Sequence, residues 1–352
     1  MKLGICTGGG DCPGLNAAIK AIVASSIQQG HEVIGIRDSL TGLLESPPRF
    51  QTLLWNHVDD ILTRGGTILG TDNSGNPYSD PTKRTQRVKT TLDNARLLGL
   101  DVLIVIGGEG TQAIAALLSE AGLPVIGVPK TIDNDLPATD KTIGFDSAVD
   151  IVRESVERLQ STAESHDRIM ILEVMGRDSG YIALHGGIAG GANVILIPEI
   201  QFEVSKIADA IDRRKKRGIH YSVVVVAEGA CAKGESPFYM KSADQKEVLG
   251  GVGNQLAKTL HQATGMETRV TVLGHVQRGG SPSANDRILA TRFGVRAVEE
   301  ALKLNFGTYL ALQGSSIVAL SYKSLIMGAR KQISLQDDHI TSAESIGIHL
   351  GR

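Results

Sequence analysis

Residues 123–136 read LPVIGVPKTIDNDL, an apolar segment followed at once by a polar one. Leu123–Val128 is too short for a helix and is bounded by turn residues, which predicts a buried β-strand. In an open α/β sheet, ligands bind just beyond the carboxyl ends of the strands. Asp133 and Asp135 follow this strand, so one is a candidate proton acceptor and the other a candidate ligand for a cation. Asn and Asp are also ordinary turn residues, and the segment by itself is equally compatible with a surface turn.

Short apolar strands alternate with helical patterns along almost the whole chain. Besides 123–128, we expect strands at Leu3–Thr7, Glu32–Ile36, Val102–Ile106, Ile169–Val174, Val194–Ile197, Ser222–Ala227 and Arg269–Leu273. We expect helices over 14–29, 111–121, 144–163, 178–190, 204–217, 250–264 and 283–304. This alternation is typical of parallel βαβ units with helices on both faces of a sheet. It predicts an α/β fold of the doubly wound class, with a long excursion at 229–249.

Length and composition limit the possible functions. The chain has 352 residues, enough for roughly two domains with full hydrophobic cores. Its formal net charge of −2 and pI near 6.5 give no global attraction to nucleic acid or to an anionic membrane. The three cysteines lack metal-binding spacing, and no apolar run approaches the ~18 residues of a membrane span. We therefore expect a cytoplasmic protein that binds neither nucleic acid nor a membrane.

The first strand is followed by a glycine-rich turn, Gly8–Gly14, that leads into a helix. Backbone N–H groups in such a turn, together with the helix N-terminus, bind anions. The spacing misses G-x-G-x-x-G by one residue, and Leu15-Asn16 stand where a P-loop needs Lys-Ser/Thr. Asp38, at the end of the second strand, occupies the place of a ribose-binding acid, so a dehydrogenase is a weak alternative.

Two further glycine-rich turns follow the same pattern. Gly107–Thr111 comes after the strand at 102–106 and holds Glu109 between glycines. A carboxylate at a strand end is well placed to bind a phosphate through magnesium. The third turn, Arg64–Thr71, reads as a structural turn.

Cationic residues also gather at the ends of predicted strands. Arg168, Arg177, Arg269 and Arg278 all lie there, an arrangement that fits capture of a sugar phosphate. A single Arg is more often part of a surface salt bridge. His275, judged alone, is as compatible with a hydrogen-bonded core histidine as with a ligand-binding residue.

Together, these segments resemble 6-phosphofructokinase of the bacterial-type family. The matching stretches run in order from the first glycine-rich turn to Pro282, and Pro129–Asp135, Glu173–Arg177 and His275–Pro282 are the most specific of them. The resemblance implies a glycolytic kinase that phosphorylates the 1-hydroxyl of fructose 6-phosphate. It implies two interwoven Rossmann-like doubly wound domains, with residues 1–143 plus 276–330 binding the phosphoryl donor and residues 144–275 plus 331–352 binding the sugar phosphate. It also implies a homo-oligomer, usually a tetramer.

The resemblance assigns a role to individual residues. Asp133 would be the catalytic base, Thr131 and Arg177 would stabilise the transferring phosphoryl group, and Glu109 and Asp135 would hold Mg²⁺. The donor-binding residues would be Gly10, Asn73, Gly108, Glu109, Gly110, Thr111 and Lys130. The sugar-phosphate residues would be Thr131, Ile132, Asp133, Arg168, Met175, Gly176, Arg177, Glu228, Arg269, His275, Val276, Gln277 and Arg278. Of these, Arg168 and Arg269 would reach the phosphate from a neighbouring subunit. Positioning and charge neutralisation of this kind are what phosphoryl transfer requires.

Four positions bear on the identity of the phosphoryl donor. Glu109 replaces the family's usual Asp, and Asn73 replaces an Arg of many ATP-using members. Gly110 leaves room for a nucleotide where pyrophosphate-using relatives carry an obstructing Asp, whereas Lys130 is typical of pyrophosphate users. The combination resembles the family's mixed-substrate subgroup. We expect ATP as the donor, because a steric obstacle is harder to overcome than a missing cation, and pyrophosphate is the alternative.

Two further expectations concern regulation and catalysis. Lys20, Ala24 and Gln160 stand where many family members carry Arg at an effector site, which predicts weak control by phosphoenolpyruvate and ADP.

A fold alone does not exclude a binding-only sensor of a nucleotide or sugar phosphate. The joint presence of a base, a transition-state Arg, an acidic metal ligand and a sugar-phosphate cluster favours an enzyme.

Overall fold

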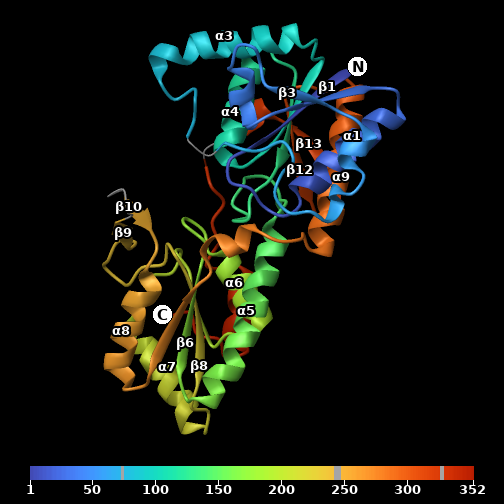
Figure 1. The fold of residues 1–352 in the computed structure, drawn as a ribbon. Helices are drawn as coiled ribbons and strands as arrows, with labels where there is room; N and C mark the ends of the chain where they lie inside the picture. Colours follow the sequence, from blue (N-terminus) through green and yellow to red (C-terminus); the bar gives the residue numbers. More distant parts are fainter. Residues whose placement is uncertain (73–74, 242–246, 326–328) are drawn as a thin grey trace. The chain divides into compact units, whose positions relative to one another are not determined.

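The computed structural model describes residues 1–72, 75–241, 247–325 and 329–352. The chain forms two compact units, one of Met1–Ser147 with Arg278–Arg330 and one of Ala148–Gln277 with Lys331–Arg352 (Figure 1). Each unit is thus built from two separate stretches of the chain, so the doubly wound domains are interwoven. The expected domain bounds differ from those of the units by a few residues, and the assignment of donor and sugar phosphate to the two domains stays a prediction.

The first unit contains a seven-stranded sheet in the order β13-β12-β5-β4-β1-β2-β3. Its strands are β1 (Lys2–Gly8), β2 (Glu32–Ile36), β3 (Phe50–Leu53), β4 (Val102–Gly107), β5 (Val125–Pro129), β12 (Thr308–Gln313) and β13 (Ser316–Ser321). The central pairs are parallel, as expected, but β2–β3 and β12–β13 are antiparallel. The strands β3, β12 and β13 were not predicted from the sequence, so the expectation of parallel pairs holds for the predicted strands alone. Only Gly314 and Ser315 connect β12 to β13, and a connection of this length is too short for the crossover that parallel strands need.

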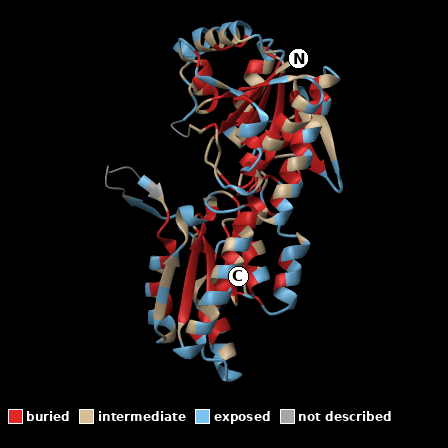
Figure 2. Ribbon diagram, turned by 45° about the vertical axis from the view of Figure 1, so that its right-hand side comes forward, coloured by how far each residue is buried: buried red, intermediate tan, exposed pale blue. Residues whose placement is uncertain are grey.

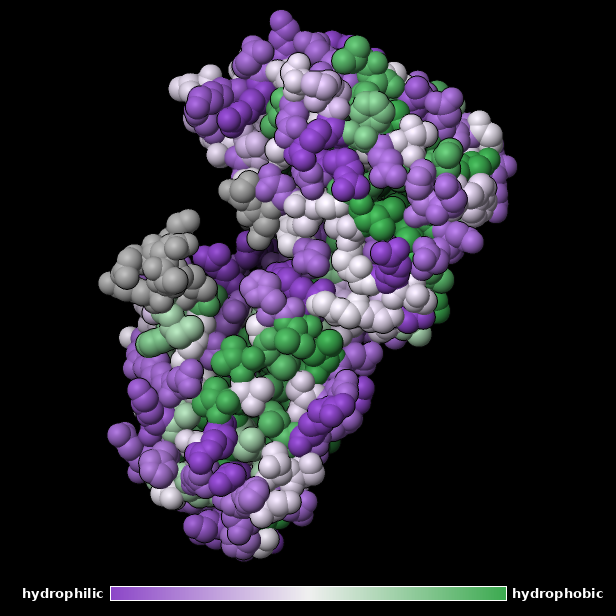
Figure 3. All heavy atoms as spheres, in the orientation of Figure 1, coloured by the Kyte–Doolittle hydropathy of each residue, from purple (hydrophilic) through white to green (hydrophobic). Residues whose placement is uncertain are grey.

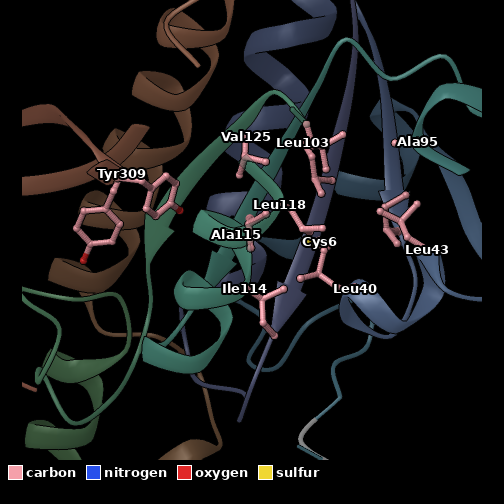
Figure 4. Packing of buried hydrophobic residues seen from close by; sticks show 14 of the residues in the cluster. Cys6, Leu40, Leu43, Ala95, Leu103, Ile114, Ala115, Leu118, Val125 and Tyr309 are labelled. Atoms are coloured by element: carbon pink, nitrogen blue, oxygen red, sulfur yellow. The ribbon is translucent and has the colours of Figure 1, made fainter. Parts of the chain in front are cut away.

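Helices cover both faces of this sheet. They are α1 (Leu15–Gln28), α2 (Trp55–Val58), α3 (Pro81–Leu97), α4 (Glu109–Glu120) and α9 (Ala284–Leu302), with short 3₁₀ turns η1 (Ser39–Leu43), η2 (Ile61–Thr63) and η4 (Tyr322–Ser324). Side chains of α3 and α4 join strand residues in one buried cluster (Figure 4). Helices α1 and α9 pack together, and α9 also contacts β5 (Figure 1).

The second unit contains a four-stranded sheet in the order β11-β6-β8-β7, in which every pair is parallel as predicted. Its strands are β6 (Ile169–Val174), β7 (Val194–Leu196), β8 (Ser222–Ala227) and β11 (Thr268–Val272). Its helices are α6 (Tyr181–Gly190), α7 (Val204–Lys216), α8 (Val252–Thr264) and α10 (Asp338–Ser345), and η3 (Gly274–Arg278) follows β11. Helix α5 (Phe145–Ser165) begins in the first unit and continues in the second. Figure 2 shows the strands of both sheets as mostly buried.

Two surface features complete the fold. The expected excursion at 229–249 contains a short antiparallel pair, β9 (Tyr239–Lys241) and β10 (Glu247–Leu249). The basic run Arg213–Lys216 occupies the last turn of α7, where Figure 3 shows hydrophilic side chains on the surface of the second unit. Cations at a helix C-terminus complement the helix dipole, which accounts for the run locally. Within the described stretches, no helix combines the length and the apolar character that crossing a membrane requires.

Candidate active site

The three central strands of the first sheet end at the same level. Gly8 of β1 pairs with Gly107 of β4, and Gly107 pairs with Pro129 of β5. Each strand is followed by one of the segments singled out from the sequence. The carboxyl edge of this sheet therefore brings together the two glycine-rich turns and the Asp133–Asp135 segment, as the parallel arrangement predicts.

A cavity of about 350 Å³ opens at this edge, within the first unit. Predicted site residues that line it are Gly10, Gly108, Glu109, Gly110, Thr111, Lys130, Thr131, Asp133, Asp135 and Arg278. Lining residues that were not predicted are Gly9, Ser39, Leu40, Thr41, Asp72, Gly75, Asn76, Pro77, Ile114 and Arg330. The volume lies within the range of small-molecule sites. Ile132 is fully buried beside the pocket residues and has a packing role.

Lys130 joins the end of β5 to the first glycine-rich turn. Its side chain is buried, and Nζ donates to the carbonyl oxygens of Gly8, at 2.9 Å, and Gly10, at 2.5 Å. Burial lowers the pKa of this ammonium, which the nearby Cys12 and acidic side chains partly oppose. The ammonium is therefore engaged by the backbone of the loop, and its contact with a donor stays a prediction.

Arg278 lies on the same loop. A side chain at Gly10 would place its Cβ 2.9 Å from Arg278 Nη1, so any larger residue would require the guanidinium to shift. Nη1 also donates to the carbonyl oxygen of Asp11 at 3.2 Å. Arg278 was predicted to bind the sugar phosphate, and the structure places it in the first unit, against the glycine-rich turn.

The segment after β5 is ordered by hydrogen bonds from Thr131 and Asn134. Thr131 Oγ1 donates to Asp133 Oδ2 at 3.3 Å and accepts from Asp133 N at 3.2 Å. Asn134 has a left-handed φ of 53°, and its side chain binds Asp140 O and Thr142 N. This turn orders the partly exposed Asp133 next to Thr131, with Asp135 buried on the far side of Asn134.

Two pocket carboxylates suit a magnesium ion. Glu109 is the first residue of α4, and Asp135 is only 6% exposed; both line the cavity. Mg²⁺ is usually held by one or two carboxylates together with waters and substrate phosphates, so this oxygen donor set fits. Among the described residues, the one cluster of three metal-binding groups within 4.8 Å is Asp337, Asp338 and His339 of the second unit. Exposed acidic groups of that kind are common without a metal.

In the second unit, the predicted sugar-phosphate residues form two groups. Arg168 and Arg269 lie at the amino ends of β6 and β11, and both pair with Glu267, which was not predicted. The Arg168 Nε–Glu267 Oε2 distance is 2.7 Å, and Arg168 is the first cause of the lowered pKa of this exposed Glu267 carboxyl. Glu267 thereby holds the two guanidinium groups next to each other.

The other group lies at the carboxyl end of the same sheet. Met175, Gly176 and Arg177 directly follow β6, and Glu228 follows β8. Gln277 is buried and donates to Gly274 O, while its Oε1 accepts from Met175 N at 3.2 Å. The six residues of β6 separate the two groups by roughly 15–20 Å. A single copy of this unit therefore cannot direct both groups at one phosphate.

The remaining predictions have mixed outcomes. His275 and Val276 are exposed, so the interpretation of His275 as a core histidine was wrong. The third glycine-rich turn is structural as expected, because Asn16 Nδ2 donates to the carbonyls of Arg64 and Gly65. Asn73 lies outside the described residues.

The altered effector positions have local partners. Lys20 contacts Asp59, at 3.9 Å from Nζ to Oδ1. The amide of Gln160 donates to the carbonyls of Gly190 and Gly191. Weak control by phosphoenolpyruvate stays a prediction.

Two of the unpredicted pocket residues, Asp72 and Arg330, are charged. Asp72 directly follows the third glycine-rich turn, which was an available signal, and it accepts from Thr41 Oγ1 at 2.7 Å. This turn follows η2 and not a strand. Arg330 follows no predicted strand, and the sequence offered no signal for it.

The sequence matches a known protein family over most of its length. Residues 2–301 match the family model described as Phosphofructokinase. The chain is 45% identical over 354 residues to an ATP-dependent 6-phosphofructokinase of Chloroflexus aggregans, covering 100% of this chain and 98% of that protein. It is 48% identical over 322 residues to a pyrophosphate–fructose 6-phosphate 1-phosphotransferase of Amycolatopsis methanolica, covering 90% of this chain and 92% of that protein.

The fold also has solved counterparts. The structure of Pichia pastoris phosphofructokinase matches with a TM-score of 0.82 at 30% identity. The match covers 99% of this chain and 37% of the solved chain, so this chain spans just over a third of that larger protein.

Proposed function

The chain belongs to the phosphofructokinase family, and we propose that it transfers the γ-phosphoryl group of ATP to the 1-hydroxyl of fructose 6-phosphate. The products are fructose 1,6-bisphosphate and ADP. The observation that carries this proposal is the single cavity where Asp133, Glu109 and Asp135 meet two glycine-rich turns. Relatives that span the full length of the chain support the same reaction.

We assign a residue of this chain to each step of the proposed phosphoryl transfer. Asp133 accepts the proton of the 1-hydroxyl as its oxygen attacks the γ-phosphorus, and ADP leaves with the bridging oxygen. Thr131, which donates to Asp133, orients the base and stabilises the transferring group. Arg177 of the second unit is the proposed second stabilising residue. Glu109 and Asp135 would hold Mg²⁺, which neutralises charge on the donor phosphates when bound.

The donor assignment depends on Gly110. It lines the cavity, and a Cβ added there would meet no atom within 4 Å. Packing therefore does not require glycine at this position, and its missing side chain leaves space beside the phosphates for a nucleoside. Lys130 and the pyrophosphate-using relative favour the alternative donor.

A direct assay separates the two donors. Fructose 1,6-bisphosphate formation is measured with MgATP and with magnesium pyrophosphate in separate reactions. We expect turnover with MgATP. Turnover with pyrophosphate alone would overturn the assignment of ATP, and tight fructose 6-phosphate binding without turnover on either donor would favour the sensor.

We also propose self-association, with a homotetramer as the expected assembly in the cytoplasm. Its support is the placement of Arg168 and Arg269 at the opposite end of β6 from Met175–Arg177. A second copy of the chain is then needed to present the two arginines to a sugar phosphate bound near Met175.

A further inference from the structure

Arg330 is a cation of the donor pocket that no family motif assigned. It belongs to the last stretch of the first unit and lines the cavity. Its Nε lies 3.8 Å from Asp135 Oδ2, and the two side chains are 36% and 8% exposed. Arg330 thus brings a guanidinium to a buried carboxylate at the position proposed for the donor phosphates.

The charges around the cavity show why this cation matters. Four carboxylates line it, those of Asp72, Glu109, Asp133 and Asp135. A phosphoryl donor adds several negative charges to the same space, so binding requires cations that can face the phosphates.

The other two lining cations each have backbone partners. Lys130 donates to the carbonyls of Gly8 and Gly10, and Nη1 of Arg278 donates to that of Asp11. Arg330 differs because its ion pair is with a pocket carboxylate, and such a pair can exchange when an anion enters.

The guanidinium of this ion pair is more than a third exposed, and its Nε lies 3.8 Å from the buried carboxylate, so an entering anion can compete with Asp135 for it. A guanidinium carries its N–H donors in a rigid planar fork that matches phosphate oxygens, and it stays charged at any physiological pH. The pairing with Asp135 keeps that fork at the mouth of the cavity.

We propose that Arg330 is a donor-binding residue that contacts the phosphates of a di- or triphosphate and pairs with Asp135 when no donor is bound. This inference rests on the proposed function of the pocket. Because Arg330 would recognise phosphate and not nucleoside, it should act equally on both donors. Gly110, in contrast, should discriminate between them.

The test uses variants of the full chain. Arg330→Gln removes the charge, and Arg330→Lys keeps the charge without the fork. Arg96→Gln is the matched control, because Arg96 is 73% exposed on α3 and pairs only locally, with Asp93. Binding of MgATP and of magnesium pyrophosphate is measured by titration calorimetry without sugar, and KM for each turned-over donor and for fructose 6-phosphate is measured separately.

We expect Arg330→Gln to weaken binding of both donors by at least ~10-fold, as for loss of a hydrogen bond to a charged group. The donor affinity of Arg330→Lys should lie between those of Arg330→Gln and wild type, and the donor affinity of Arg96→Gln should equal that of wild type. KM for fructose 6-phosphate should not change. Donor affinity within about twofold of wild type in Arg330→Gln would overturn the proposal, as would an equal loss of sugar binding.

The proposed function can fail independently. Absence of turnover by the wild-type chain would reject that function, while the binding titrations would still test Arg330. Normal turnover with unchanged donor affinity in Arg330→Gln would reject the role of Arg330 alone.

Discussion

The two units use similar strand–loop–helix segments but place their functional residues differently. In the first unit, the proposed residues converge on one cavity at the carboxyl edge of the sheet. In the second unit, Arg168 and Arg269 lie at the amino ends of the strands, whereas Met175 and Glu228 follow the carboxyl ends. The first unit therefore forms its pocket by itself, whereas under the proposed self-association the second unit would need another copy of the chain to bring its two groups to one ligand. Substitution of the proposed site residues in the first unit should lower kcat, donor affinity or stability. Substitution of Arg168 or Arg269 should weaken only the binding of fructose 6-phosphate.

The largest expected effect concerns the base. Asp133→Ser should lower kcat by at least ~10², because the hydroxyl proton loses its acceptor in the transition state. Binding of donor and of fructose 6-phosphate should remain close to wild type in calorimetric titrations. Asp93→Asn, which removes a carboxylate from the surface of α3, is the control. A variant with wild-type kcat would show that the base lies elsewhere and would break the contrast between the units.

The second prediction concerns Asp286, a buried carboxyl of the first unit. It accepts from Gly144 N at 2.9 Å, Ser147 N at 2.8 Å and Ser147 Oγ at 2.6 Å, at the start of α5. Burial nevertheless raises its pKa from 3.8 to about 6. The folded state thus binds this proton more tightly than the unfolded chain does. The protonated Asp286 carboxyl therefore contributes its full stabilisation below about pH 4, and this stabilisation is lost as the pH rises to about 6.

The measurement is denaturant unfolding from pH 4 to pH 7 for wild type and Asp286→Asn. The free energy of unfolding of wild type should fall relative to that of Asp286→Asn as the pH rises. The change across this pH window should be up to about 3 kcal/mol. A difference that is flat with pH would show that the hydrogen bonds to the carboxylate cancel the cost of its burial.

The third prediction concerns Lys130, which lines the proposed donor pocket. Lys130→Met should destabilise the protein by about 2 kcal/mol, because the carbonyls of buried Gly8 and partly buried Gly10 lose their donor. Thermal or denaturant unfolding measures this loss, and Lys83→Met, at a position 64% exposed, is the matched control. Unchanged stability with weaker donor binding would instead assign Lys130 directly to the phosphates.

The smallest expected effect lies in the second unit. Arg269→Ala should raise KM for fructose 6-phosphate about 10-fold and leave KM for the donor unchanged, as for a lost charge-assisted phosphate contact. Mixing Arg269→Ala subunits with Asp133→Ser subunits should restore part of the activity, because wild-type groups from the two chains then meet in some hybrids. Absence of complementation despite proven subunit exchange would mean that all ligands come from one chain.

The sequence alone determined much of the fold and of the first site. The strands Glu32–Ile36, Ile169–Val174 and Ser222–Ala227 have the predicted bounds, because most of their residues are apolar and buried. The glycine-rich turns and Asp133–Asp135 were found because ligand-binding residues follow such strands directly. The sequence also held the signal that Arg168 precedes β6 while Arg177 follows it, which places them at opposite ends.

The tertiary structure decided what local pattern does not encode. Helix α3 was missed because Thr91 and Ala95 are its only buried residues. A helix with so narrow an apolar stripe shows little periodicity of apolar residues in its sequence. Strand β3 is partly exposed and lacks the apolar run that marks a central strand. Strands β12 and β13 were also missed, although both contain apolar residues in succession. Lys130 meets the carbonyls of Gly8 and Gly10, and Arg330 meets Asp135, across long stretches of chain. Such pairings depend on which strand ends become neighbours in space, and only the packed sheet fixes that.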